Sequence, residues 1–315
     1  MYLGIDIGGT AVKIGLVTEN GEIIVSNSYD VAFDNYDTPI FNTVKNAIEI
    51  FINENAIELK NIKGIGVSAT GQVNTTSGKI IGVGGNIKKW CDTEIKKELE
   101  DIYNLNTTVV NDANCMVLGE GWVGKGRGYK NIIGVTIGTG VGGGIVVDSK
   151  ILLGSVGIAG ELGHFSINSE GKKCTCGNVG CYEQYASTTA LIRNVKEKYE
   201  LLGVSSFNKE DINGKFIFEQ IEKGNKIIKE IVSNWIIDIG KGLVSLVHIF
   251  NPEIIIIGGG VSKQEDLFIK PLRKYVLENV MKKFGENLKI ESAELGNNAG
   301  VVGAVYYNIK SNNLN

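Results

Sequence analysis

The chain has 315 residues, of which 43% are apolar and 21% charged, a globular composition long enough for two domains. Its 32 basic and 35 acidic side chains give a net charge of −3, which offers no electrostatic case for a nucleic-acid-binding or membrane-surface protein. The 42 glycines beside 3 prolines, without a short period, exclude collagen and argue against disorder.

The N-terminal sequence MYLGIDIGGT predicts a strand followed by a turn. It has neither the basic start nor the long apolar core of a signal peptide, and no apolar run of the chain approaches the roughly 20 residues that span a bilayer. The five cysteines are too few and too clustered for a disulfide scaffold. We therefore expect a cytoplasmic protein that binds neither membrane nor nucleic acid.

An internal repeat predicts two similar hairpins. Residues 3–17 and 133–147 each run from an apolar strand through a Gly-rich turn into a second apolar strand. The second turn, TGVGGG at 139–144, holds more glycine than a hairpin needs. Because backbone N–H groups without side chains suit a polyphosphate, we expect both tips to bind phosphate.

The remaining pattern is that of a mixed α/β protein. Short β-branched runs that end in polar or Gly-rich turns predict buried strands at 62–71, 107–115 and 252–260. Helices are expected at roughly 40–55, 93–103, 113–123, 184–199, 216–249, 263–284 and 298–309. The polar segment 200–215 is expected to be a surface loop.

Two aspartates lie where strands are expected to end. A carboxylate beside a phosphate loop would repel phosphate unless a cation lay between them, so Asp6 is a candidate Mg²⁺ partner, directly or through water. The alternative is an Asp that caps a turn. Asp112, in VVNDANC, could accept the proton of a substrate hydroxyl during phosphoryl transfer, whereas Asn111 and Asp112 could also simply cap the next helix.

A cluster of metal-ligand residue types follows the second hairpin. His164 stands ten residues ahead of a C-x-C-x₄-C run formed by Cys174, Cys176 and Cys181. This set fits a tetrahedral Cys₃His zinc site without an open position, hence a structural metal, and the alternative is a loop of reduced thiols. Glu161 and Glu183 bracket the cluster and could accept hydrogen bonds from sugar hydroxyls; a glycosidase pair is the competing interpretation.

GGG at 258–260 follows the apolar run EIIII and would let the backbone lie flat against a ligand such as an adenine ring. The spacing G-x-G-x-x-G of a dinucleotide site is not met there, and no P-loop motif occurs in the chain.

Taken together, these residues resemble the sugar kinases of the ROK family (repressors, open reading frames and kinases), within the hexokinase–actin–Hsp70 superfamily. The resemblance runs from DIGGT at 6–10 through NDAN at 111–114 to IIGGG at 256–260. Its most specific part is ELGH at 161–164 with CTCGNVGCYE at 174–183, which matches the family's zinc signature. It implies an α/β fold of two ribonuclease H-like, actin-like ATPase domains around a central cleft for ATP and a sugar.

The resemblance also implies roles for individual residues. Asp112 is the catalytic base that takes the proton of the sugar 6-hydroxyl. Zinc is bound by His164, Cys174, Cys176 and Cys181. The sugar contacts are Asn86, Asn111, Asp112, Glu161, His164 and Glu183. The ATP-binding residues are Asp6, Gly8, Gly9, Thr10, Lys13, Gly138, Thr139, Gly140, Gly258, Gly259 and Gly260.

The domains implied are 1–112, joined by the last helix 297–312, and 113–296, in a homodimer. The implied reaction is ATP- and Mg²⁺-dependent phosphorylation of an aldohexose, glucose first, to the sugar 6-phosphate and ADP. The alternative is an N-acetylmannosamine or N-acetylglucosamine kinase, since SATGQVNTTSG departs from the Pro-Gly turn of the family's glucokinases. A non-catalytic sugar sensor is the more remote alternative, because both expected phosphate loops and the acid at position 112 are intact. The position of Asp6, six residues from the N-terminus, also leaves no room for the DNA-binding region of the family's regulators. An Hsp70-like or actin-like ATPase would have no use for the zinc cluster.

Overall fold

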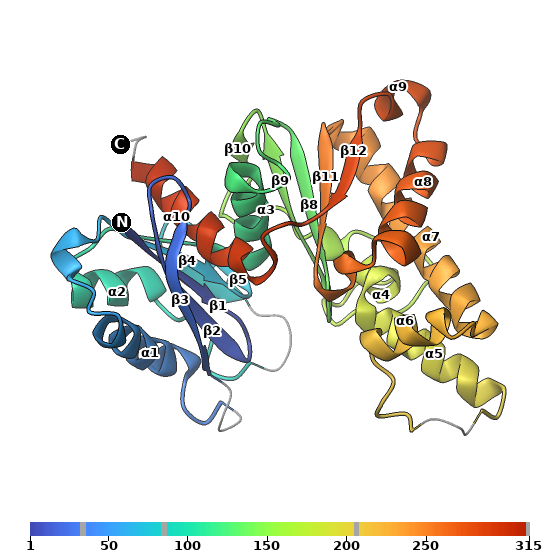
Figure 1. The fold of residues 1–315 in the computed structure, drawn as a ribbon, viewed down its shortest axis with the longest axis horizontal. Helices are drawn as coiled ribbons and strands as arrows, with labels where there is room; N and C mark the ends of the chain where they lie inside the picture. Colours follow the sequence, from blue (N-terminus) through green and yellow to red (C-terminus); the bar gives the residue numbers. More distant parts are fainter. Residues whose placement is uncertain (32–35, 83–86, 205–207, 313–315) are drawn as a thin grey trace. The chain divides into compact units, whose positions relative to one another are not determined.

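The computed structural model describes residues 1–31, 36–82, 87–204 and 208–312. They form two compact units (Figure 1). The first comprises Met1–Lys130, Gly144–Gly160 and the chain from Glu294 onward, and the second comprises Asn131–Gly143 and Glu161–Ala293. The mixed α/β class expected from the sequence is confirmed, with a five-stranded sheet in the first unit and parallel strands of another in the second.

The sheet of the first unit has the order β3-β2-β1-β4-β7. Its antiparallel part is the predicted hairpin of β1 (Tyr2–Ile7) and β2 (Ala11–Val17), extended by β3 (Ile23–Asp30). The strands β1, β4 (Ile65–Ala69) and β7 (Thr107–Asn111) are parallel. Ile7 pairs with Ala69 and Ala69 with Asn111, so the carboxyl ends of these three strands lie at one edge of the sheet.

Helices cover this sheet and bury its apolar side chains. The helix α1 (Ile40–Glu54) packs through Phe51 and its other apolar residues into a core with the strands and Trp90. The helix α10 (Ala299–Asn312) packs closely on β4. A Cβ at Gly66 would overlap the Ala304 backbone, so glycine at this position permits the close approach. The unit also contains α2 (Ile95–Tyr103), α3 (Asp112–Val123), the short helices η1 (Leu59–Asn61) and η5 (Gly296–Asn298), and the hairpin β5 (Gln72–Asn74) and β6 (Lys79–Gly82).

The helix α3 and residues 144–160 belong to the first unit, whereas the sequence predicted a second domain that begins at residue 113. The reason for α3 is its close packing on α10, where a Cβ at Gly303 would overlap the Cys115 carbonyl. Helix faces of small residues let two backbones approach in this way.

The second sheet has the order β10-β9-β8-β11-β12, and its strands β8 (Ile132–Ile137), β11 (Ile254–Gly258) and β12 (Lys289–Ser292) lie in the second unit. These three strands are parallel. The hairpin predicted at 133–147 is formed by β8 and β9 (Val141–Val147), and β10 is Lys150–Ile151. The helical elements of this unit are η2 (Leu162–His164), α4 (Glu183–Ala186), α5 (Thr188–Leu201), α6 (Gly214–Glu222), α7 (Lys226–Phe250), η3 (Gly260–Lys263), the π-helical η4 (Glu265–Ile269), α8 (Lys270–Asn279) and α9 (Lys282–Gly285).

The prediction of one long helix over residues 216–249 was wrong. The segment 216–249 forms α6 and α7, which are separated because Gly224 adopts a φ of 85° and Asn225 caps α7 by accepting a bond from the Ile228 N–H. The strand expected at 107–115 ends at Asn111, where α3 begins.

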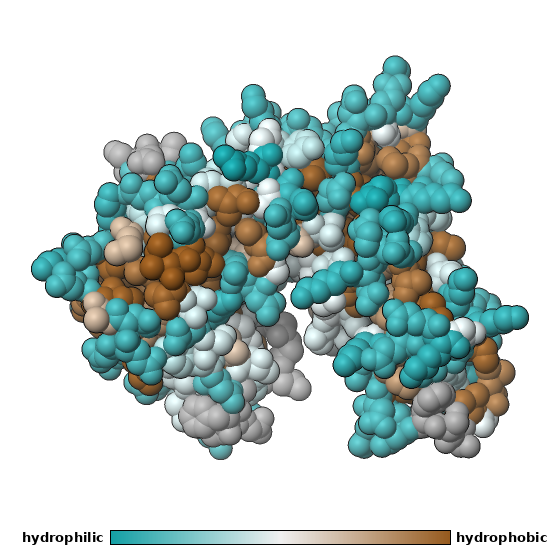
Figure 2. Space-filling model, viewed as in Figure 1, coloured by the Kyte–Doolittle hydropathy of each residue, from teal (hydrophilic) through white to brown (hydrophobic). Residues whose placement is uncertain are grey.

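Hydrophilic side chains cover much of the face of each unit drawn in Figure 2. Among the described residues, no helix combines the length and apolar character needed to cross a membrane.

Candidate functional site

The first hairpin places a buried carboxylate beneath its tip. Asp6 lies opposite Lys13 on β2 and beside Ser68 on β4, and the Ser68 hydroxyl donates to Asp6 Oδ1 at 2.5 Å. Burial raises the pKa of Asp6, while the Ser68 hydrogen bond and the Lys13 charge lower it. Lys13 Nζ in turn donates to Asn298 Oδ1.

The tip itself offers backbone donors. Gly8 N–H is used within the turn, where it donates to the Ala11 carbonyl at 2.9 Å. Within the described part of the chain, the Gly9 and Thr10 N–H groups have no hydrogen-bond partner. Asp6 Oδ2 likewise accepts no hydrogen bond from the described residues. An unused carboxylate oxygen below unused N–H groups fits a hydrated Mg²⁺ with a phosphate chain.

Asn111 and Asp112 lie where β7 turns into α3. Asn111 Oδ1 caps the helix by accepting from the Ala113 N–H at 3.0 Å and the Asn114 N–H at 3.3 Å. Its Nδ2 donates to the Gly71 carbonyl at 3.0 Å, which leaves one amide hydrogen over. Asp112 Oδ1 accepts from the Ala113 N–H at 2.8 Å. The capping alternative is therefore confirmed for Asn111, and capping holds the Asp112 backbone in a fixed place.

The second hairpin tip is tied to the helices that follow it. Gly138 N–H donates to the Gly140 carbonyl at 3.0 Å, and the Gly138 carbonyl accepts from the Thr188 N–H at 2.9 Å. Glu183 Oε2 accepts from the Val141 N–H at 3.4 Å. Within the described ranges, the N–H groups of Thr139 and Gly140 have no partner, so they remain available to an anion.

The turn after β11 lies close to this tip. Gly259 has a φ of 96°, and a Cβ there would overlap the Ile137 carbonyl at the end of β8, so glycine is required. Gly258 ends β11, and Gly260 begins η3.

Both turns open on one pocket of about 650 Å³ in the second unit. Its lining includes Gly138 and Thr139 from the hairpin tip and Gly260 from the turn after β11. No sequence pattern marked the other lining residues, which come from α5, α6 and the η3 region: Thr188, Thr189, Ile192, Gly214, Lys215, Phe218, Glu219, Glu222, Val261, Lys263 and Gln264. The size suits a nucleotide, and the wall combines apolar side chains with backbone donors.

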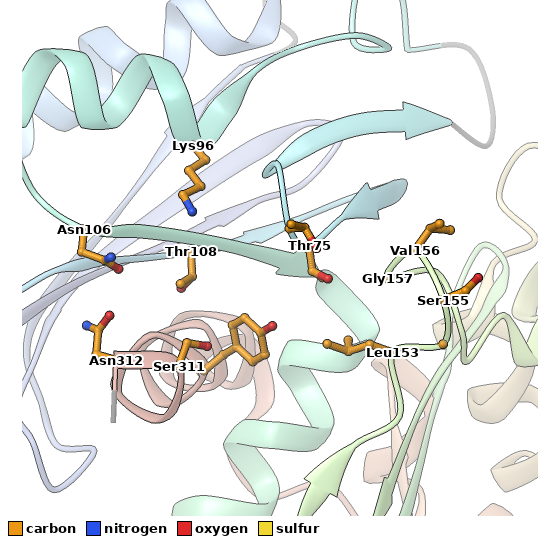
Figure 3. A pocket seen from close by; sticks show the side chains of 13 residues that line it. Thr75, Lys96, Asn106, Thr108, Leu153, Ser155, Val156, Gly157, Ser311 and Asn312 are labelled. Carbon is orange, nitrogen blue, oxygen red and sulfur yellow. The ribbon is translucent and has the colours of Figure 1, made fainter. Parts of the chain in front are cut away.

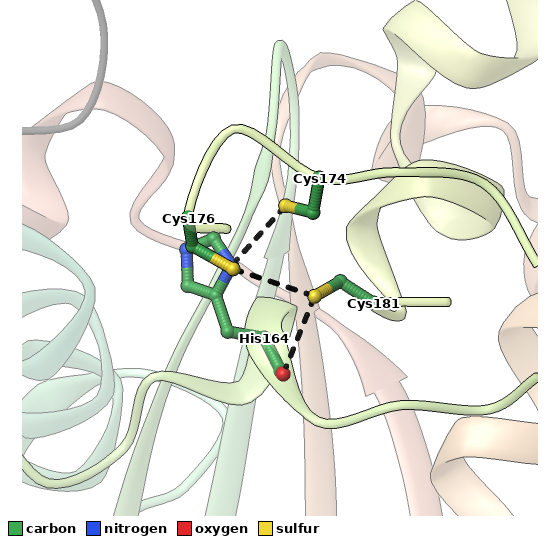
Figure 4. Close-up of side chains that lie close together, drawn as sticks. All are labelled: His164, Cys174, Cys176 and Cys181. Carbon is green, nitrogen blue, oxygen red and sulfur yellow. Dashed lines mark hydrogen bonds between the residues drawn. The ribbon is translucent and has the colours of Figure 1, made fainter. Parts of the chain in front are cut away.

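The four metal-ligand candidates come together in the second unit (Figure 4). The ligand atoms of His164, Cys174, Cys176 and Cys181 all lie within 4.8 Å of one another. Cys174 Sγ is 3.7 Å from His164 Nδ1, and the sulfurs of Cys176 and Cys181 are 3.5 Å apart.

This arrangement fits zinc. Zn–S bonds of about 2.3 Å in a tetrahedron separate two sulfurs by roughly 3.8 Å, close to the spacing found. Four ligands fill that coordination, so the site fits a structural metal without an open position.

Glu161 and Glu183 flank this cluster as predicted. Glu183 Oε1 accepts from the Cys174 thiol at 3.6 Å, which connects the cluster to the carboxylate that holds Val141. Glu161 is exposed as a residue, yet partial burial of its carboxyl and the nearby Glu183 raise its pKa, whereas His164 lowers it. Asn86, the remaining sugar contact expected, lies outside the described residues.

In each unit, parallel strands end in glycine-rich or acidic turns, so the chain is an α/β protein with candidate ligand sites at the carboxyl ends of its strands. A sequence model of the ROK family matches residues 2–310. The glucokinase of Thermotoga maritima is 32% identical over 308 residues, which cover 96% of this chain and 95% of that protein. The chain belongs to the ROK family.

Solved structures agree with the fold. A ROK family glucokinase from Streptomyces griseus in complex with glucose and AMPPNP has a TM-score of 0.81 at 30% identity, covering 96% of this chain and 97% of that one. A putative N-acetylmannosamine kinase from Listeria monocytogenes has a TM-score of 0.82 at 30% identity, covering 99% of each chain. The actin-like ATPase fold expected from the sequence is thereby confirmed.

Proposed function

We propose that the protein is a sugar kinase that transfers the γ-phosphoryl group of ATP to the 6-hydroxyl of an aldohexose, with glucose as the first candidate. Family membership and the similarity to sugar kinases support the coarser part of this proposal. The observation that carries it is the 650 Å³ pocket, because two loops singled out as phosphate and adenosine loops both line it.

Asp112 is proposed as the general base. A carboxylate held at the first turn of α3 can accept the 6-hydroxyl proton while that oxygen attacks the γ-phosphorus. The capping bonds of Asn111 fix its own side chain, and its remaining amide hydrogen can donate to a sugar hydroxyl.

Glu161, Glu183 and His164 are proposed to bind the sugar hydroxyls, since carboxylates accept hydrogen bonds from vicinal hydroxyl groups. The free N–H groups of the two tips are proposed to hold the phosphates, with Lys13 and the turn at 258–260 as further ATP contacts. Mg²⁺ held near Asp6 would neutralise charge on the phosphates.

The test is ADP release with Mg·ATP and a panel of glucose, N-acetylmannosamine, N-acetylglucosamine, fructose and mannose. We expect kcat/KM for glucose to exceed the others at least about tenfold, a difference of about 1.4 kcal/mol. Asp112→Asn should bind the sugar within about threefold of wild type but lose about 10²–10⁴-fold in kcat. The matched control is Asp101→Asn on the exposed face of α2, which should keep wild-type kcat. A near wild-type kcat in Asp112→Asn would refute the base.

The N-acetylmannosamine kinase alternative is favoured by the similarity to the Listeria structure, and a preference for that sugar would establish it. Sugar binding without turnover on the whole panel, from folded and zinc-loaded protein, would instead favour a sensor. The homodimer stays a prediction, which sedimentation equilibrium would check.

A further inference from the structure

The first unit contains a second pocket, of about 350 Å³, that the proposed reaction does not use (Figure 3). Its volume is at the lower end of the about 300–1,000 Å³ of small-molecule sites. One wall is made by Lys96 of α2 with Asn106 and Thr108 at the start of β7, and another by the loop Leu153–Gly157. Thr75, Thr76, Tyr307, Ser311 and Asn312 complete the lining.

The charge of this pocket is positive. Among the described residues that line it there is no aspartate or glutamate. Lys96 is half-buried, and within the described part of the chain its ammonium group has no hydrogen-bond or ion-pair partner. Glu100, one turn further along α2, is occupied by the Thr107 N–H at 3.0 Å. A partly desolvated ammonium group without a counterion favours an anionic ligand.

The position of Lys96 is fixed by its backbone. Its N–H donates to the Gly78 carbonyl, and its Cβ lies so close to Gly78 that a side chain there would overlap it. The stem of the lysine therefore leaves α2 at a defined point, and in Figure 3 the side chain extends toward Thr108.

Neighbouring side chains face the pocket as donors. The buried amide nitrogen Asn308 Nδ2 shares its two hydrogens among four acceptors: the Ile65 carbonyl at 3.0 Å, Thr108 Oγ1 at 3.2 Å, and the carbonyl and Oδ1 of Asn106 at 3.3 Å each. The amide hydrogens of Asn106 and the hydroxyl hydrogen of Thr108 are the donors that these two side chains can offer to a ligand. Within the described ranges, those hydrogens have no acceptor.

The other polar groups suit hydroxyls. Burial raises the pKa of Tyr307, whereas its interactions with Ser311 and Thr75 lower it. Ser155, Thr76 and Asn312 each carry a donor and an acceptor.

We propose that this pocket, the Lys96 pocket, binds a small hydroxylated oxyanion of the size of a sugar acid or a sugar phosphate. The oxyanion group lies against Lys96, Asn106 and Thr108, and its hydroxyl groups face the side of Ser155 and Tyr307. A neutral sugar leaves the ammonium group unpaired and binds more weakly.

The test is isothermal titration calorimetry of the full chain with gluconate, glucose 6-phosphate, inorganic phosphate and glucose, without ATP. Lys96→Met should weaken gluconate or glucose 6-phosphate binding about tenfold or more, the size expected for a lost charge-assisted hydrogen bond. Lys97→Met is the matched control, because Lys97 is the exposed neighbour on α2 and pairs with Glu94. It should change affinity less than twofold. Glucose binding should be the same in all three proteins.

A second variant tests whether the ligand is an anion, because it places a negative charge in the pocket. Asn106→Asp keeps an acceptor for Asn308 but adds a negative charge, so it should weaken the anionic probes about tenfold and leave glucose unaffected. Loss of binding to gluconate alone, or to glucose 6-phosphate alone, supports the site and identifies the carboxylate or the phosphate as its ligand.

The proposal is overturned if Lys96→Met binds both probes like wild type, or if inorganic phosphate binds as tightly as either probe. It is equally overturned if neither probe binds at about 10 mM, where a Kd of about 1 mM gives near saturation. These measurements need no turnover. Because glucose 6-phosphate is also the product of the proposed reaction, the deciding readouts are gluconate binding and the loss of affinity in Lys96→Met relative to Lys97→Met, which do not depend on the outcome of the kinase assay.

Discussion

Replacement of Glu120 should loosen the first unit at the segment that supports Lys13. Glu120 lies in α3, is fully buried, and accepts three backbone hydrogen bonds. Oε1 accepts from the N–H groups of Glu294 and Leu295 at 2.8 and 2.7 Å, and Oε2 accepts from the Lys125 N–H at 3.0 Å. The segment held in this way leads directly into η5, whose Asn298 binds Lys13.

The size of the effect follows from these bonds. Hydrogen bonds to a charged acceptor contribute about 1.5–3 kcal/mol each. Glu294 and Lys125 are exposed, so water can replace part of what is lost in Glu120→Ala. We therefore expect the free energy of unfolding to fall by about 2–4 kcal/mol, the truncated side-chain volume included.

The assay is urea unfolding followed by circular dichroism, with Lys125→Met as the control. Lys125 Nζ lies 3.8 Å from Glu294 at the surface, and such an exposed pair contributes about 0–1 kcal/mol. At a temperature where Glu120→Ala is folded, its KM for ATP should also rise, because Asn298 and Lys13 are less well held. A loss below about 1 kcal/mol in Glu120→Ala would refute the reasoning.

Three further predictions concern the sites. Ser68→Ala should raise the pKa of Asp6 further, because the hydrogen bond from the Ser68 hydroxyl lowers that pKa. A ¹³C NMR titration of Asp6 without Mg²⁺ and nucleotide measures the pKa, and an unchanged value would contradict this role of Ser68. Chelation should release one metal ion per chain and lower Tm and sugar affinity together, whereas zinc-free protein with full activity would exclude the Cys₃His site. Glu183→Gln should weaken sugar binding about tenfold or more, because the sugar loses a hydrogen bond to a charged group. A Kd for the sugar within twofold of wild type would show that Glu183 is not a sugar contact.

Local patterns explain what the sequence could predict. Gly140 and Gly259 lie in turns where a Cβ would overlap Glu183 Oε2 and the Ile137 carbonyl, so the residue type itself indicates a close approach of the backbone. The metal cluster is similar, because three of its four ligands lie within eight residues and form one loop. Such features depend little on distant packing.

Tertiary pairing explains what the sequence could not predict. Nothing in GEGW marks Glu120, because the N–H groups it accepts from at 294 and 295 are about 170 residues away. Ser68 matters because β4 pairs with β1 in the register that places it beside Asp6. The edge strand β3 was missed because its partly exposed, mixed sequence IIVSNSYD has no clear apolar alternation.

The contact between Glu183 and Cys174 connects the metal-ligand cluster to the second hairpin tip. Cys174 Sγ lies 3.6 Å from Glu183 Oε1, while Glu183 Oε2 accepts from the Val141 N–H at 3.4 Å. One carboxylate therefore touches both the cluster and the tip. If Glu183 binds the sugar as proposed, a metal that fixes Cys174 also fixes the surroundings of a sugar contact, so metal and sugar binding are expected to be linked through the rigidity of this loop.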